Sequence, residues 1–226
     1  MRHDLKRALT EDEMARRVAQ EIKDGYCVNL GAGMPFPVSQ HIPKGMWAMI
    51  QIEHGMLGIG GEAQDPIIRD RDLIGLGRRP VLAVPGASCF SSVASFTMLR
   101  GGHIDMTVLG AFQVSEKGDL ANWLLPGHCP IVGGAMDIVG HVKRTIIMMT
   151  HVTKKGEPKI LRECTLPITA YGAVSMVVSD LAVIEVTPEG LTLLEVAPGY
   201  TADEIQAVTE PQLQVSRELK EVVVME

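Results

Sequence analysis

Short apolar runs alternate with helix-forming segments along this chain, and that alternation limits the folds it can adopt. The runs lie at residues 26–30, 47–52, 80–84, 105–109 and 145–149. Runs of this length are typical of strands buried on both faces of a parallel sheet. We therefore predict an α/β fold, with an open and mostly parallel sheet covered by helices.

Helix boundaries are marked by capping signals. Thr10 and Thr201 each stand three residues before a glutamate, the spacing of a capping box. Apolar residues then recur every four positions from Met14 to Ile22, and Gly25 can end that helix. A second capped helix is expected over residues 91–100, and Pro35 is placed to open a helix after the loop that follows the first strand.

The C-terminal part differs from this alternation. Residues 181–186 and 191–196 are apolar runs that flank the turn at 187–190, which contains Pro and Gly. This pattern predicts an antiparallel hairpin at an edge of the sheet. We expect one domain over residues 1–226, with residues 217–226 as a frayed tail.

Composition excludes several classes of function. The net charge is -6 with both signs interspersed, which argues against a nucleic-acid partner. No run approaches the roughly 20 apolar residues of a membrane span, and the four cysteines are far apart without a C-x-x-C pair. We expect a cytoplasmic protein with reduced thiols and no membrane association.

Patterns that resemble known cofactor, metal and serine hydrolase motifs are not supported by the residues around them. Residues 58–63 fit G-x-G-x-x-A, but Asp65 and Pro66 fall where a phosphate-binding helix should continue. The histidines show no metal-ligand spacing, so no metal site is predicted. Residues 86–89 only approach the G-x-S-x-G motif of serine hydrolases.

Two features suggest chemistry. Glu53 follows an apolar run and precedes the glycine-rich stretch 55–61, which we expect to be a loop at the carboxyl edge of the sheet. Capping a helix or pairing with an arginine is the commoner role of such an acid. Gly133 and Gly134 precede a helical pattern, and their N–H groups could hold an anion or a developing oxyanion. A glycine turn chosen for steric reasons explains them equally well.

Several separate blocks carry a family resemblance. They are residues 53–60, 95–105, 118–123, 133–137, 159–167 and 179–183. In this order they resemble the B subunit of family I 3-oxoacid CoA-transferases. The resemblance implies a fold shared with ribose-5-phosphate isomerase, and a homologous A subunit that completes the active site in an A2B2 heterotetramer.

The resemblance also implies roles for particular residues. Glu53 matches the catalytic nucleophile, and Gly133, Gly134 and Asp105 match oxyanion or positioning residues. Residues that match the substrate and CoA site are Gly31, Ala32, Gly33, Met34, His54 and Gly55. The chain departs from the family in having His54 where Asn is usual and Gly61 where Pro is usual, and residues 90–94 lack the acids that many relatives carry.

The implied reaction moves CoA between an acyl-CoA, such as succinyl-CoA, and a carboxylic acid, such as a 3-oxoacid. A glutamate carboxyl has an ordinary pKa near 4.3, so it is ionised at pH 7 and attacks a thioester without a neighbouring base. A glutamyl-CoA thioester on Glu53 is the implied intermediate, and CoA is a substrate rather than a cofactor. Alternatives are an acetate/butyrate-type or 3-oxoadipate CoA-transferase, a sugar-phosphate isomerase, and a non-catalytic regulatory protein of the same fold.

Overall fold

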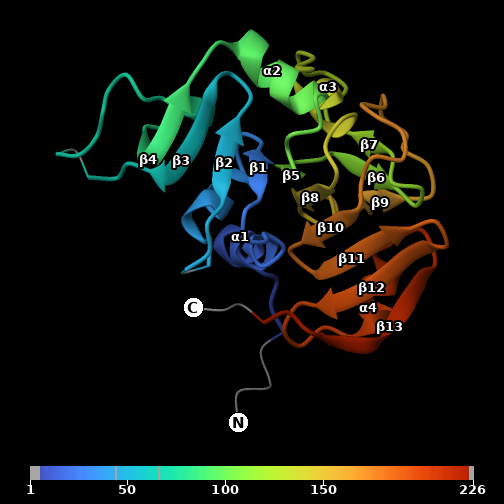
Figure 1. The fold of residues 1–226 in the computed structure, drawn as a ribbon. Helices are drawn as coiled ribbons and strands as arrows, with labels where there is room; N and C mark the ends of the chain where they lie inside the picture. The colour runs from blue at the N-terminus through green and yellow to red at the C-terminus, as the bar shows by residue number, and fades with distance from the viewer. Residues whose placement is uncertain (1–5, 44, 66, 224–226) are drawn as a thin grey trace.

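A ten-stranded mixed sheet forms the centre of the molecule (Figure 1). The computed structural model describes residues 6–43, 45–65 and 67–223. In sheet order the strands are β13 (Leu213–Glu221), β12 (Gly190–Val196), β11 (Ala182–Thr187), β10 (Met176–Ser179), β8 (Thr145–Met149), β5 (Met106–Leu109), β1 (Cys27–Leu30), β2 (Met49–Ile52), β3 (Met56–Glu62) and β4 (Val81–Cys89).

The five central strands, from β10 to β2, are parallel, as the buried apolar runs predict. Antiparallel pairs flank them on both sides, with β3 and β4 beyond β2 and with β11 and β12 beyond β10. A small second sheet contains β7 (Leu120–Ala121), β6 (Gln113–Ser115) and β9 (Ile160–Leu161). The prediction of an α/β fold with an open, mostly parallel sheet is confirmed.

Helices cover both faces of the sheet. They are α1 (Glu11–Ala19), α2 (Ser92–Arg100), α3 (Ala135–Val139) and α4 (Ala202–Ala207), with short 3-10 turns η1 (Phe36–Gln40) and η2 (Leu76–Arg78). Alternate residues of a strand point to opposite faces, so Ile146 belongs to the core beneath α1 and Ile147 to the core beneath α2, α3 and α4. This alternation divides the interior into two apolar layers.

Helix α1 is held to the sheet by a buried ion pair. Arg17 donates to the Glu195 carboxylate of β12 through Nε at 2.8 Å and Nη2 at 3.1 Å, and it also donates to Glu21 at 2.7 Å. These two carboxylates raise the pKa of Arg17 against the lowering effect of its burial. The capping boxes predicted at Thr10 and Thr201 are both present.

The structure corrects four sequence-based predictions. Residues 56–62 of the glycine-rich stretch form strand β3 rather than a loop, and only a 3-10 turn follows Pro35. The C-terminal hairpin is present but is not at the sheet edge, because β13 pairs in parallel with β12. The expected frayed tail is therefore wrong for residues 217–221, and residues 224–226 lie outside the described part of the chain.

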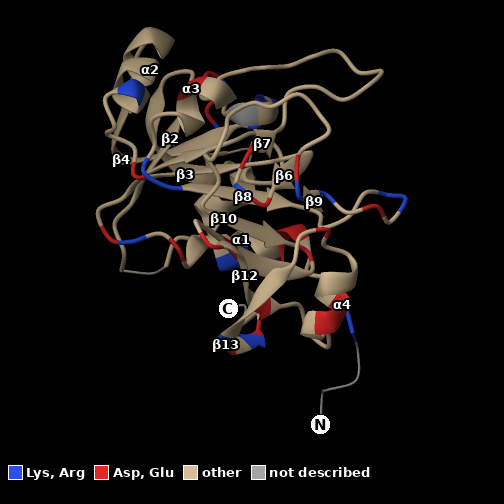
Figure 2. Cartoon of the chain, turned by 90° about the vertical axis from the view of Figure 1, so that its right-hand side faces the viewer, with Lys and Arg blue, Asp and Glu red and all other residues tan. Residues whose placement is uncertain are grey.

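Charged residues lie mainly on the helices, on β13 and in the loops, with both signs interspersed, and strands such as β2, β8 and β10 contain none (Figure 2). No basic stripe follows a described helix or strand in this view. None of the described helices is both long and apolar enough to cross a membrane.

Candidate active site

Glu53 lies in a tight turn between two hydrogen-bonded strands. Strands β2 and β3 are antiparallel, with Ile52 opposite Met56, and the Gly55 N–H donates to the Ile52 carbonyl at 3.1 Å. Gly55 has φ +126°, and a Cβ there would lie 2.1 Å from the carbonyl oxygen of Phe90. Only glycine fits this close approach, so the backbone around Glu53 is tightly constrained.

The carboxylate of Glu53 is half-buried, and one of its oxygens has no partner. Oε2 is shielded from solvent and makes no hydrogen bond within the described part of the chain. Leaving a buried polar atom unpaired costs free energy, and such atoms are uncommon in folded proteins. Glu53 Oε2 therefore neither caps a helix nor pairs with an arginine, the two commoner roles of such an acid.

Gly134 lies directly beside Glu53. A Cβ built on Gly134 would stand 3.4 Å from Cγ of Glu53 and 2.8 Å from Cζ of Phe96 in α2. Glycine at this position thus lets the α3 terminus approach both side chains. Gly133 has φ +55°, and the N–H groups of Gly133 and Gly134 donate to no acceptor among the described residues. Two free donors therefore lie in the loop that touches the Glu53 side chain.

Helices α2 and α3 are fixed to each other next to this loop. Arg100 of α2 makes a two-pronged ion pair with Asp137 of α3, through Nε at 2.9 Å and Nη2 at 2.8 Å. The Arg100 guanidinium also stacks 5.8 Å from the centre of the Phe96 ring. Exposed pairs contribute little to global stability, but this geometry holds Phe96 and Gly134 in one arrangement.

A chain of buried polar side chains runs beneath Glu53. Thr107 donates to Asn29 at 2.8 Å, Asn29 donates to Gln51 at 2.7 Å, and Gln51 donates to the Ser95 hydroxyl at 2.5 Å. Ser95 in turn donates to the carbonyl oxygen of Ile52, the residue before Glu53, at 3.4 Å. All four polar side chains are fully buried. The chain links β5, β1 and β2 to α2.

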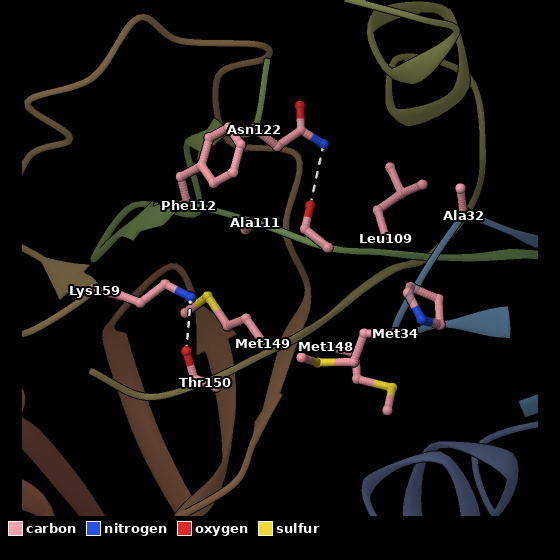
Figure 3. A pocket seen from close by; sticks show the side chains of 13 residues that line it. Ala32, Met34, Leu109, Ala111, Phe112, Asn122, Met148, Met149, Thr150 and Lys159 are labelled. Atoms are coloured by element: carbon pink, nitrogen blue, oxygen red, sulfur yellow. Dashed lines mark hydrogen bonds between the residues drawn. The ribbon is translucent and has the colours of Figure 1, made fainter. Parts of the chain in front are cut away.

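The loop at residues 31–34 lies on the same edge of the sheet. Strands β1 and β2 are parallel with Asn29 opposite Gln51, a register that places Gly31 level with Glu53. Gly31, Ala32 and Met34 line a cavity of about 350 Å³ over the ends of β1, β5 and β8 (Figure 3). His54 is exposed beside Glu53, and Gly33 is exposed at the loop tip. The structure therefore brings these predicted residues to one edge of the sheet.

Asp105 is the predicted site residue that the structure does not bring to Glu53. It precedes β5, its N–H donates to the Cys27 carbonyl, and its carboxylate accepts bonds from the Cys27 N–H and from Lys143. The register places it level with Met49, at the opposite ends of the parallel strands. At about 3.3 Å per residue, roughly 13 Å separates this level from Glu53. The Lys143 ammonium and the Cys27 N–H lower the pKa of Asp105 against the effect of desolvation.

Among the described residues, no group of three or more His, Cys, Asp or Glu side chains could hold a metal ion.

Comparison with known proteins identifies the family of this chain. Residues 11–207 match the family Coenzyme A transferase. The chain belongs to the coenzyme A transferase family.

Three curated CoA-transferases show the range of its relatives. The chain is 46% identical to the B subunit of a probable succinyl-CoA:3-ketoacid coenzyme A transferase of Bacillus subtilis, over 90% of this chain and 94% of the relative. It is 44% identical to the beta subunit of the acetate CoA-transferase of Escherichia coli (92% and 95% covered). It is also 45% identical to the B subunit of the 3-oxoadipate CoA-transferase of Pseudomonas putida (89% and 94% covered).

Solved structures show the same fold. An acyl-CoA transferase from Escherichia coli O157:H7 superposes with a TM-score of 0.72 at 20% identity, and the match covers 97% of this chain and 45% of that one. Glutaconate CoA-transferase from Acidaminococcus fermentans superposes with a TM-score of 0.68 at 16% identity, covering 98% of this chain and 92% of that one.

The structure also argues against a dinucleotide site at the G-x-G-x-x-A pattern, because residues 58–62 lie in β3 instead of opening a helix.

Several residues of this CoA-transferase site were not singled out from sequence. Asn29 and Gln51 are polar residues inside strand-forming runs, and that interruption is the signal that could have revealed the buried chain. Phe96 and Ser95 gave no separate signal, because their importance depends on where α2 packs.

Proposed function

We propose that this chain is the catalytic B subunit of a CoA-transferase that moves CoA between an acyl-CoA, such as succinyl-CoA, and a 3-oxoacid. The observation that carries the proposal is the Glu53 carboxylate, whose buried Oε2 is unpaired next to Gly134. A homologous A subunit completes the site in an A2B2 assembly. Relatives that are 42–46% identical are named as B subunits, and these names support such a partner.

The first half-reaction makes and breaks two bonds. A Glu53 oxygen attacks the thioester carbonyl carbon, the C–S bond breaks, and a mixed anhydride and CoA thiolate form. The thiolate then attacks the glutamyl carbonyl carbon of the anhydride. The C–O bond breaks, the first acid leaves as a carboxylate, and a glutamyl-CoA thioester remains. A second acid reverses these steps and leaves as its acyl-CoA.

Each attack passes through a tetrahedral oxyanion. The unpaired N–H groups of Gly133 and Gly134 lie next to the Glu53 side chain, where they can stabilise that charge. The constrained turn at Gly55 and the close approach of Gly134 limit the positions open to the Glu53 side chain, so little orientational freedom is lost on reaction. Burial of the carboxylate also limits the access of water, which would hydrolyse the anhydride or the thioester.

Trapping the intermediate tests the proposal. The complex of this chain with its A-type partner, incubated with acyl-CoA and no acceptor acid, should carry a CoA-sized mass on the peptide that contains Glu53. Glu53→Gln should abolish both the adduct and CoA transfer. Glu185→Gln, a matched change of an exposed glutamate in β11, should leave both intact. Full transfer by Glu53→Gln would exclude this mechanism.

The acid pair is a separate question. Acetate and 3-oxoadipate transferases are as similar to this chain as the 3-ketoacid enzyme is, at 44%, 45% and 46% identity respectively. Rates measured with succinyl-CoA, acetyl-CoA and butyryl-CoA against acetoacetate, acetate and 3-oxoadipate would rank these alternatives. The proposal of a 3-oxoacid enzyme requires acetoacetate or 3-oxoadipate to be a faster acceptor than acetate, and the ratio of those two rates separates the 3-oxoadipate alternative.

A further inference from the structure

Helix α2 contacts both parts of the candidate site. In its first turn, Ser95 donates to the carbonyl oxygen of Ile52, the residue before Glu53, at 3.4 Å. At its end, Arg100 pairs with Asp137 of α3 at 2.9 and 2.8 Å. One short helix therefore connects the strand that leads to the proposed nucleophile with the helix that follows the paired glycines.

The position of Gly134 depends on α3. The loop before it, residues 126–133, is exposed, and no side chain of the described residues caps α3 at Gly134. The Gly134 carbonyl accepts from the Ile138 N–H at 3.0 Å, and Ile138 is buried in the core. Asp137 lies beside Ile138 in the same helical turn, so a contact that anchors Asp137 also anchors Gly134.

These contacts form a closed circuit. From Arg100 and Asp137 it runs along α3 to Gly134, where a Cβ would stand 3.4 Å from Cγ of Glu53. Phe96 of α2 adds contacts on the same path, because its Cζ lies 2.8 Å from that Cβ position and its ring centre 5.8 Å from the Arg100 guanidinium. The paired glycines therefore cannot move away from Glu53 without breaking one of these contacts.

The ion pair is exposed, with 55% of the Arg100 side chain and 40% of the Asp137 side chain accessible to solvent. Such a pair adds little to the stability of the whole chain. Its two parallel hydrogen bonds nevertheless fix the orientation of both groups, which a single contact would not do. Since a displacement of about 1 Å at a catalytic group can slow a reaction by about 100-fold, a pair that is weak in stability can still control a rate.

We propose that Arg100 and Asp137 are positioning residues, which act through α3 to hold the Gly133 and Gly134 N–H groups beside the Glu53 carboxylate. This inference rests on the proposed CoA transfer at Glu53. The oxyanion that these N–H groups stabilise exists only during the reaction. Loss of the pair should therefore lower kcat and leave KM nearly unchanged.

A double-mutant cycle in the assembled complex tests the pair. Arg100→Met and Asp137→Asn should each lower kcat for CoA transfer by about 10-fold and change KM by less than about 2-fold. The double variant should be no slower than the slower single variant, because the same interaction is lost in all three. Arg100→Lys keeps the charge without the two-pronged geometry, so its kcat should lie between those of wild type and Arg100→Met.

Arg79 supplies a matched control. It pairs with Glu62 at 3.2 Å, and its guanidinium lies 6.0 Å from the centre of the Phe36 ring, so it repeats both the ion pair and the aromatic contact. Glu62 ends β3, whereas Glu53 lies in the turn at the other end of that strand. Arg79→Met should therefore leave kcat unchanged.

Hydrogen exchange separates this inference from the proposed reaction. The Ile138 N–H is bonded to the Gly134 carbonyl, so its exchange rate reports whether Gly134 keeps its position. Exchange at Ile138 in the complex should be faster in Arg100→Met and in Asp137→Asn than in wild type. Absence of a CoA adduct in the wild-type complex would overturn the proposed function alone, because faster exchange at Ile138 would still show that the pair holds Gly134.

Three results would overturn the assignment of the pair. They are a rate loss in the double variant that multiplies those of the single variants, a raised KM with unchanged kcat, and unchanged exchange at Ile138. Loss of assembly in light scattering would overturn it too, since the pair would then serve assembly rather than the position of Gly134.

Discussion

Gln51 donates a hydrogen bond from its side-chain amide to the hydroxyl of Ser95 at 2.5 Å, joining β2 to α2 beneath Glu53. Both side chains are fully buried, so neither has access to water as a substitute partner. This bond connects the strand that ends at the candidate nucleophile to the helix whose Phe96 packs beside it.

Ser95→Ala removes the last side chain of this buried hydrogen-bonded chain, the one that belongs to α2. The Gln51 amide then loses its acceptor in a dry environment, and we expect the free energy of unfolding to fall by about 1–3 kcal/mol. The rate of CoA-adduct formation at Glu53 should also fall, because the Ile52 carbonyl loses one of its two donors and keeps only the Gly55 N–H. Urea denaturation and quenched mass spectrometry measure the two effects. Thr97→Ala, on the exposed face of the same helix, is the control and should change neither.

Gly134→Ala places a methyl group 2.8 Å from the Phe96 ring and 3.4 Å from Glu53 Cγ. Because the ring and the carboxylate must shift, we expect transfer to slow on the order of 100-fold, while circular dichroism remains native. Adding Phe96→Leu should recover part of the rate by making room for the methyl group. A Gly134→Ala enzyme with wild-type rate would show that this close approach has no catalytic role.

His151 should make stability depend on pH. It is fully buried between Ser179 and Thr209, and burial, with a smaller contribution from the Lys159 charge, lowers its pKa from 6.5 to about 4. Between pH 6.5 and about pH 4, His151 is therefore protonated in the unfolded state but neutral in the folded state. Stability contributed by neutral His151 is complete above pH 6.5 and declines by about 1 kcal/mol per pH unit as the pH falls toward 4.

The check compares wild type with His151→Gln in urea denaturation at pH 7, 6 and 5. Residues that titrate in both proteins cancel in the difference between their unfolding free energies. We expect that difference to shrink as the pH is lowered, and a constant difference would contradict a buried neutral histidine.

Arg17→Met should be strongly destabilising. It leaves the Glu195 carboxylate buried, with only the exposed Lys220 at 3.5 Å, and it also removes a partner of Glu21. Breaking such a pair typically costs about 3–5 kcal/mol. The double variant Arg17→Met with Glu195→Leu should recover much of that loss, because the buried carboxylate at position 195 is then gone. Thermal unfolding of both variants at pH 7 measures the difference.

The sequence predicted elements whose determinants are local. The Thr10 and Thr201 capping boxes depend on residues three positions apart, and the central strands on short apolar runs. Strand β3 was missed because its glycines are poor strand formers, and pairing with both β2 and β4 outweighs that preference. Strand β13 was missed for a related reason, since its exposed polar residues are held by pairing with β12 rather than by burial.

In the candidate site, too, some residues could be predicted from the sequence and others could not. Glu53 and the Gly133–Gly134 loop could be picked out because a lone acid and paired glycines stand out in the sequence. The level of Asp105 could not, because it depends on the register between β5 and β1, which no local pattern encodes. The cavity beside the 31–34 loop gave no sequence signal either, since its walls come from segments that only the fold brings together.

The three-residue turn at Glu53 joins two paired strands, and Gly55 in this turn lies against the Phe90 carbonyl. The turn therefore has little conformational freedom. The backbone therefore holds the Glu53 side chain at a fixed point of the sheet edge. In the CoA transfer proposed above, both acids and the pantetheine arm of CoA would reach Glu53 in turn, and any movement during turnover would come from the neighbouring helices or from the proposed A subunit. Lengthening the turn by one residue would remove this constraint and let the backbone of Glu53 move.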